Sequence, residues 1–545
     1  MVLFIGSAAY VEAGEMEATQ STEGLCWSTY FGGNGGEYVN GSDLDDAENY
    51  YVAGWGNSTW ATFPHTALSP APVTPSVNPN GFISKFDKND ILKWTTLFGG
   101  GTNTLTIVYD VAVQTSASDT TAYVVGYTES ANFPVLAAGS AYFDGVGTTG
   151  RVEQGFLFKV DYRGYRTWCT YFGDQKTAIT GIDVATIRRH TEVVFTGYSK
   201  QLPNEQVTPP VNATHFTYSG GDQDAFVAKL NMYDQLQWRT YYGGTNTELG
   251  YDIAYASSGA FYVVGRTASS NVPLVSKAGA YNASYSGGDD VFLLQFNIGT
   301  TLTWATYYGG TADDEVFWNS LAVNRKSNND VYIVGRTNSS SFPLKVKALA
   351  FNDGSYTGPD RGFIARFNGT SQALDWCTFF GHGNYAAANA IAFRKDGVSY
   401  YVAGAVSMGS IFLQASINNM YYQPVINANL PFPLDQDPSL LASTRTTYCG
   451  GPLISAAWPI RMNTSRPWSA RSTIRCSPAA IRPNTRTRLP ISRCIPPAIR
   501  SLITIPHGTV RPPWNSRIAS SPGSALGPSP GRQGMRSKPL GRRIP

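Results

Sequence analysis

The sequence predicts an all-β protein made of one repeated unit, and three observations support this. Gly and aromatic residues are abundant, with 55 Gly, 32 Tyr and 27 Phe among 545 residues, whereas only 14% of residues are charged. This composition excludes a disordered, coiled-coil or collagen-like chain. Four short sequence blocks recur along the chain. The repeated part has no helical period, and no apolar run approaches the ~18 residues that a membrane-spanning helix needs.

The first block is Trp-x-Thr, followed by two aromatic or apolar residues and Gly. Its six copies begin at Trp27, Trp94, Trp168, Trp238, Trp304 and Trp376, which are 66 to 74 residues apart. A packing requirement acts on every unit alike, so recurrence in all six units indicates core packing rather than a sugar-stacking platform.

The other three blocks have the pattern of short strands. An apolar run closed by Gly occupies residues 51–54, 123–126, 194–197, 262–265, 332–335 and 401–404. A run that alternates Phe, an apolar residue and a polar residue, mostly Lys or Arg, occupies 81–86, 155–160, 225–230, 291–296 and 362–367. A third apolar run occupies 110–113, 182–185, 251–254, 320–323 and 390–393. Four strands in each of six units predict a β-propeller of about six four-stranded blades, whereas a β-helix would need much shorter coils.

The order of the blocks also predicts how the ring closes. If the Trp block is the last strand of each blade, the strand at 27–32 has no earlier partner in the chain. We therefore expect it to complete the sixth blade beside the strands near 391 and 401, because an unpaired edge would expose backbone polar groups.

Two segments carry the clearest family motifs, residues 332–343 (Tyr-Ile-Val-Gly-Arg-Thr-Asn-Ser-Ser-Ser-Phe-Pro) and residues 224–230 (Asp-Ala-Phe-Val-Ala-Lys-Leu). Together with the Trp block they resemble the SBBP family of bacterial β-propeller repeats, over residues 27 to about 404. The first unit is shortened, Leu202-Pro203 replaces Phe-Pro in the third, and the sixth lacks its Phe-Val-x-Lys-Leu strand. The resemblance implies an exported or cell-surface bacterial protein, of a kind often without assigned activity.

The chain divides into three predicted parts. Residues 1–20 include an apolar run at 2–11, which indicates either the remnant of a secretory signal or an edge strand. Residues 21–437 form the repeat domain, with 24 basic and 35 acidic residues. Residues 438–545 hold 16 Arg, one Lys and no acidic residue. This basic tail, rich in Pro, Arg and Ser, is predicted to be out of frame or disordered, and the alternative is a basic arm that binds nucleic acid or an acidic surface.

The length of the unit points to a binding surface. A unit of about 70 residues exceeds the ~40 to 50 residues of common blade types. The excess lies in five loops, at 55–80, 127–154, 198–223, 266–289 and 336–360. Equivalent loops leave a ring on one face, so these polar and aromatic loops predict a ligand surface there, which we call the long-loop face.

Several residues of these loops are candidates for a site. Carboxylates beside Gly suggest calcium ligands, at Asp222, Asp224, Asp289, Asp290 and Asp360, although each Asp can equally stabilise the turn by bonding its own backbone. Tyr218, Tyr285 and Tyr356 precede these turns and are candidate ligand-binding residues. Arg266 and Arg336 follow the Gly of the second block, and they either clamp an anionic group or form ion pairs within or between blades.

The motifs of catalysis are absent from the sequence. There is no Gly-x-Ser-x-Gly or His-Glu-x-x-His motif, and the five His have no metal-ligand spacing. We therefore predict a secreted or cell-surface module that binds glycans or proteins, or mediates adhesion, without catalysis. The alternative is an extracellular polysaccharide hydrolase or lyase with its site on the long-loop face or in the central channel. We expect a monomer, no cofactor other than calcium, and no nucleic-acid partner.

Overall fold

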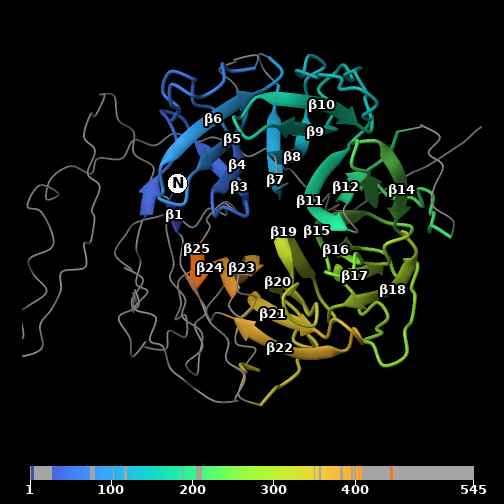
Figure 1. The fold of residues 1–545 in the computed structure, drawn as a ribbon. Helices are drawn as coiled ribbons and strands as arrows, with labels where there is room; N and C mark the ends of the chain where they lie inside the picture. The colour runs from blue at the N-terminus through green and yellow to red at the C-terminus, as the bar shows by residue number, and fades with distance from the viewer. Residues whose placement is uncertain are drawn as a thin grey trace, which may run out of the picture. The chain divides into compact units, whose positions relative to one another are not determined.

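Six sheets surround a common centre in the computed structural model (Figure 1). The structure describes residues 2–4, 28–73, 80–101, 104–115, 119–187, 190–203, 212–348, 350, 352–354, 358–380, 385–393, 397, 400–407 and 442–445. All regular elements in these residues are β-strands, and all strand pairs are antiparallel. The predicted all-β propeller is therefore confirmed. None of the described residues forms a helix with the length and apolar character needed to cross a membrane.

Five of the sheets have four strands, and each is a blade whose strands follow chain order, so we number them blades 1 to 5 along the chain. The innermost strands are β3 (Glu37–Leu44), β7 (Thr106–Thr115), β11 (Ala178–Ile187), β15 (Glu248–Tyr255) and β19 (Asp314–Val323). The second strands are β4 (Tyr50–Gly56), β8 (Thr120–Thr128), β12 (His190–Ser199), β16 (Phe261–Thr267) and β20 (Val331–Thr337). The third strands are β5 (Asn80–Phe86), β9 (Gln154–Val160), β13 (Asp224–Leu230), β17 (Asp290–Phe296) and β21 (Arg361–Phe367). The outermost are β6 (Leu92–Phe98), β10 (Arg166–Phe172), β14 (Leu236–Tyr242), β18 (Leu302–Tyr308) and β22 (Leu374–Phe380).

The sixth sheet differs from the prediction in its third strand. It consists of β23 (Tyr385–Phe393), β24 (Tyr400–Ser407) and β25 (Ala442–Arg445), so the strand beside β24 comes from the segment predicted to lack structure. The expected closing strand, β2 (Ser28–Tyr30), pairs instead with β1 (Val2–Phe4). The first residues of the apolar run, Val2–Phe4, thus form a strand that pairs with β2.

Each second-block run ends in Gly because the neighbouring inner strand lies too close to leave room for a side chain. A Cβ at Gly126 would lie 1.9 Å from the carbonyl oxygen of Ile107. The ladder between β7 and β8 shifts register between Val108 and Asp110, next to this Gly. Only a residue without a side chain fits at such a bulge, which explains why the block ends in Gly.

The five recurring Trp residues that the structure describes pack in the core, as predicted, and Trp27 lies outside the described residues. Trp168, Trp238 and Trp304 are among the largest fully buried side chains. Their indole N–H groups donate to carbonyl oxygens of the long loops: Trp168 to Tyr142 at 2.9 Å, Trp238 to Thr214 at 2.9 Å and Trp304 to Tyr281 at 2.8 Å. Buried indoles usually find such an acceptor, so each Trp also attaches a loop to its blade.

The long loops fold back along the outermost strands. Isolated bridges join Leu136 to Cys169, Val275 to Ala305 and Lys345 to Cys377. The loops continue toward the next blade, where the amide of Tyr142 donates to Asp234 O. The extra length therefore covers the outer side of the blades and links neighbours, and this corrects the expectation that it mainly enlarges one face.

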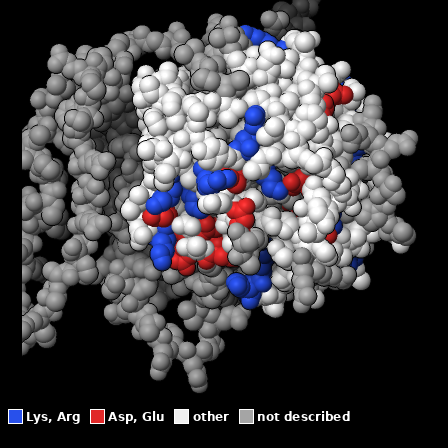
Figure 2. Space-filling view, turned by 45° about the horizontal axis from the view of Figure 1, so that its top comes forward, with Lys and Arg blue, Asp and Glu red and all other residues white. Residues whose placement is uncertain are grey.

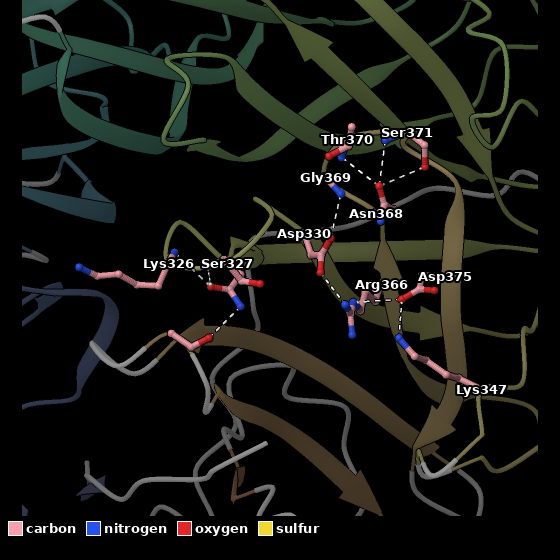
Figure 3. A network of polar contacts seen from close by, with 12 residues as sticks. Lys326, Ser327, Asp330, Lys347, Arg366, Asn368, Gly369, Thr370, Ser371 and Asp375 are labelled. Atoms are coloured by element: carbon pink, nitrogen blue, oxygen red, sulfur yellow. Dashed lines mark hydrogen bonds and ion pairs between the residues drawn. The ribbon is translucent and has the colours of Figure 1, made fainter. Parts of the chain in front are cut away.

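The charged residues of the third block form ion pairs at the blade ends that lie opposite the long loops. In blade 5, Arg366 pairs with Asp330 at 2.5 Å and with Asp375 at 3.2 Å, and Figure 3 shows this network beside the turn at Asn368. The Arg366 guanidinium also lies over the Tyr332 ring, 5.7 Å from its centroid. The equivalent Lys159 lies 4.6 Å from the Tyr123 ring and pairs with Asp234. These cations therefore bind the second-block Tyr and a turn Asp, which gives them a structural role.

Carboxylates near the centre of the ring join neighbouring inner strands. Asp43 accepts a hydrogen bond from Val113 N, Asp110 from Ile182 N, Asp183 from Tyr255 N and Asp252 from Leu321 N, at 2.7 to 3.0 Å. Each carboxylate lies in the blade that precedes, along the chain, the blade of the amide that donates to it. Burial raises the pKa of Asp43 and that of Asp252 to about 7, although the backbone hydrogen bonds oppose this rise.

Candidate functional site

The two predicted Arg residues meet at the junction between blades 4 and 5. Arg266 lies 2.7 Å from Asp289 and 3.3 Å from Glu315, and Arg336 lies 2.6 Å from Glu315 and 3.3 Å from Asp360. Glu315 thus bridges both guanidinium groups, and the five side chains form one alternating chain of charges. All five are partly exposed. The arrangement is the inter-blade ion pair named above as the alternative to an anion clamp.

Each predicted Tyr that the structure describes stabilises its own turn. The hydroxyl of Tyr218 donates to Gly221 O at 2.8 Å, and that of Tyr285 donates to Gly288 O at 2.5 Å. Their rings lie edge to face against Tyr241 and Tyr307, respectively. Tyr356 lies outside the described residues. Both rings remain half-buried, so their binding role stays a prediction.

The five predicted calcium ligands have different surroundings. Asp289 and Asp360 belong to the charge chain, and Asp222 pairs with Lys176. Asp224 and Asp290 are buried, and each accepts a hydrogen bond from a backbone amide of its own turn. No group of three or more His, Cys, Asp or Glu side chains in the described part of the chain is arranged to hold a metal ion. Calcium binding therefore stays a prediction, and the turn-forming role is visible for Asp224 and Asp290.

The pair of Asp222 with Lys176 gives a direct test of the calcium prediction. The Lys176 Nζ lies 2.5 Å and 2.6 Å from the two carboxylate oxygens, and the side chains are about half exposed. Asp222→Asn should lower the free energy of unfolding by at most about 1 kcal/mol, because water screens an exposed pair. Urea denaturation with and without calcium checks this. Stabilisation by calcium that the variant loses would contradict a purely structural role and support ligation.

An aromatic group near the centre of the ring was missed by sequence reasoning. β19 has ten residues against eight in β15, and its ladder with β20 is interrupted between Val316 and Leu321. The interruption projects Trp318, which packs against Tyr109 of β7 with ring centroids 4.7 Å apart and ring planes tilted by 32°. The next residue, Asn319, has a φ of 60° and donates to Asn40 O of β3 at 2.5 Å. This bulge of blade 5 therefore contacts blades 1 and 2 across the ring.

Further aromatic side chains occupy the same end of the inner and second strands. Tyr38 and Trp55 stack with centroids 4.4 Å apart, and Tyr109 lies 6.0 Å from Tyr127. Trp318 is 38% exposed, which is unusual for Trp in a ring of buried strands. We call Tyr38, Trp55, Tyr109, Tyr127 and Trp318 the axial aromatic cluster. It lies at the strand ends from which the long loops leave, and Glu315 of the charge chain is three residues before Trp318.

One signal in the sequence could have revealed this cluster. Trp318 has no counterpart in the other units, and two extra residues separate the start of β19 from its Val323 end. A residue that occurs in one unit only has a role other than the packing that all units share.

Figure 2 shows charged side chains of both signs gathered in one region of the face in view, while most of the other described residues in view are uncharged.

Comparisons with known proteins do not assign a function. No protein-family model and no curated protein matches the chain. Among solved structures it is similar to a lignostilbene dioxygenase from Pseudomonas brassicacearum, at 11% identity and a TM-score of 0.26, covering 68% of this chain and 87% of that one. It is also similar to a member of the DUF4221 family from Bacteroides vulgatus, at 11% identity and a TM-score of 0.20, covering 61% and 92%. At these TM-scores neither likeness bears on activity.

Proposed function

We propose that the protein is a binding module that holds a glycan, or a protein that carries one, at the long-loop end of the ring without catalysis. The observation that carries the proposal is the axial aromatic cluster with its exposed Trp318. An exposed aromatic face offers large contact area at low entropic cost, and sites of this kind combine aromatic rings with a few polar groups. An exported or cell-surface location is part of the proposal and rests on the family resemblance of the motifs.

The charges beside the cluster favour a neutral ligand. Arg266 and Arg336 are both engaged by carboxylates, and the charge chain holds three acids against two bases. An anionic polysaccharide would have to displace these carboxylates, whereas hydroxyl groups of a neutral sugar can bond to either sign of charge. The same pairing argues against the hydrolase alternative, because Asp289, Glu315 and Asp360 each neutralise an Arg.

Retention of the full chain on immobilised neutral and acidic polysaccharides tests the proposal. Trp318→Ala should weaken binding to the neutral ligand about tenfold or more, because aromatic residues at the centre of an interface carry much of its energy. Tyr233→Ala is the matched control, since Tyr233 is 62% exposed on the turn at the other end of the blade 3 strands. Equal binding by the two variants would contradict the proposed site. Release of new reducing ends from the polysaccharide would instead favour the hydrolase.

A further inference from the structure

Two junctions between blades bring buried carboxylates together in pairs. Asp224 and Glu248 meet between blades 3 and 4, and Asp290 and Asp314 meet between blades 4 and 5; all four side chains are fully buried. A Cβ placed on Gly309 would lie 2.1 Å from Asp290 Oδ1 and 2.7 Å from Asp314 Oδ2. A Cβ on Gly243 would lie 2.9 Å from Asp224 Oδ1 and 2.6 Å from Glu248 Oε2. In both junctions the two acids therefore approach the same Gly.

The donors around each pair leave carboxylate oxygens without a partner. Asp290 Oδ2 accepts from Ser286 N at 2.8 Å, and Asp314 Oδ2 accepts from Gly310 N at 2.6 Å and from the Ser339 hydroxyl at 3.0 Å. Both oxygens of Glu248 accept hydrogen bonds, one from the Thr267 hydroxyl and one from Gly244 N, each at 2.7 Å. Among the described residues nothing donates to Oδ1 of Asp224 or to Oδ1 of Asp290. No cation contacts these oxygens within that part of the chain either. Two ionised carboxylates in such a dry position would repel one another strongly.

Equivalent junctions elsewhere in the ring show that the fold does not require acids there. Between blades 1 and 2, Asn80 begins the third strand and Thr106 begins the next inner strand, at the positions of Asp290 and Asp314. A Cβ on Gly99 would lie 2.2 Å from Asn80 Oδ1, so the local geometry is the same. The acidic pairs are thus a feature of two junctions rather than of the repeat.

We propose that each of the two pairs shares one proton between its carboxyl groups, so that these junctions are held together in the protonated state and loosen when the proton leaves. A shared proton supplies the missing donor to an oxygen of the partner, as in other carboxyl dyads. Each junction offers one such oxygen, on Asp224 or on Asp290, whereas a calcium ion needs about six to eight oxygen ligands. A proton therefore fits the donor set better than a metal ion does.

The charged surroundings support a transition near neutral pH. Burial raises the pKa of Asp224 and that of Asp290 to about 7 and the pKa of Asp314 to about 6, and the partner acid contributes to the rise for Asp224 and Asp290. The other groups facing the pairs are Asp289, Asp313, Arg266 through its pair with Asp289, and the rings of Tyr218, Tyr241, Tyr242, Tyr281, Tyr285, Tyr307 and Tyr308. These Tyr pKa values are raised, so their hydroxyls stay neutral over the range considered.

The direction of the pH dependence follows from proton counting. Between the ordinary carboxyl pKa near 4 and the raised values of about 6 to 7, the folded chain binds more protons than the unfolded chain. The stability that the pairs provide is fully present below pH ~4 and is lost as the pH rises through the folded pKa values. Above pH ~7 no further loss from the pairs is expected.

Thermal unfolding of the full chain from pH 4 to pH 8 tests this inference. The variant D290N/D314T copies the junction between blades 1 and 2, and D224N/E248T does the same at the other junction. Relative to the variants, the wild-type Tm should fall by about 2–4 °C per junction as the pH rises from 5 to 8. Asp43 and Asp252 titrate in both proteins, so the difference isolates the pairs. Parallel Tm curves would overturn the inference.

Two further measurements cover folding failure and the metal alternative. Asp290→Asn alone keeps one neutral partner in the pair, so it should fold and lose the pH dependence of that junction. Infrared difference spectra should show a carboxyl C=O band in the wild type at pH 5 that disappears by pH 8 and is weaker in the variant. If calcium raises the Tm of the wild type but not that of D290N/D314T in a comparison with EDTA, the pair holds a cation and the inference is wrong.

Discussion

Replacing Trp304 with Ala is expected to lower the free energy of unfolding by about 3–5 kcal/mol. The side chain is fully buried and packs 6.0 Å from the Phe367 ring, measured between centroids. Its removal opens a cavity between blades 4 and 5 and also leaves Tyr281 O without the indole donor. The loss therefore combines a packing term with a buried carbonyl that has lost a bond.

Urea denaturation followed by fluorescence measures this effect. Trp318→Ala is the control, because Trp318 is partly exposed and contacts Tyr109 through one ring pair. We expect it to cost about 1 kcal/mol, in line with an aromatic contact at the surface. Similar losses for the two variants would show that Trp304 is not a core residue.

Removing the carboxylate of Asp353 is expected to be comparably destabilising, at about 3–5 kcal/mol for Asp353→Ala. Arg361 is fully buried at the start of β21, and its Nη2 lies 2.8 Å from Asp353 Oδ2. The guanidinium also lies 5.3 Å from the Phe379 ring centroid. In the variant the guanidinium loses this carboxylate while it stays in a site that water does not reach, so most of the cost is the desolvation of the Arg361 charge.

A double variant separates the charge from its packing. Arg361→Met combined with Asp353→Leu removes both charges and keeps apolar volume, and it should recover most of the stability lost by Asp353→Ala. Chemical denaturation of the three proteins measures this. If the double variant is as unstable as the single one, the pair acts through shape or hydrogen bonding and the charge argument is wrong.

The fold was predictable because its signals are local and repeated. The Gly-closed runs, the Phe-containing runs and the Trp blocks each correspond to one strand of a blade, and their recurrence gave the number of sheets. The buried position of Trp238 followed from the same recurrence, because a residue present in every unit indicates a role in packing. These inferences need only short segments whose periodicity reflects one buried face.

The rest depended on contacts between distant segments. The return of each loop along its blade requires a carbonyl such as Thr214 O to meet an indole 24 residues later, which no local pattern encodes. The pairing of Arg266 and Arg336 through Glu315 joins three strands of two blades. Trp318 was not predicted, because the repeat pattern reveals only what the units share and this residue occurs in one unit alone.

The loops that fold back over the outermost strands protect the protein from strand addition by other chains. The last strand of a propeller blade offers a row of free N–H and C=O groups, which is a template for aggregation. Here the bridge between Lys345 and Cys377 occupies part of that row on β22, as the bridge between Val275 and Ala305 does on β18. Such bridges lie on four outermost strands, β6, β10, β18 and β22. We therefore expect the protein to remain dispersed at high concentration, and proteolysis within a loop should promote self-association before it unfolds a blade.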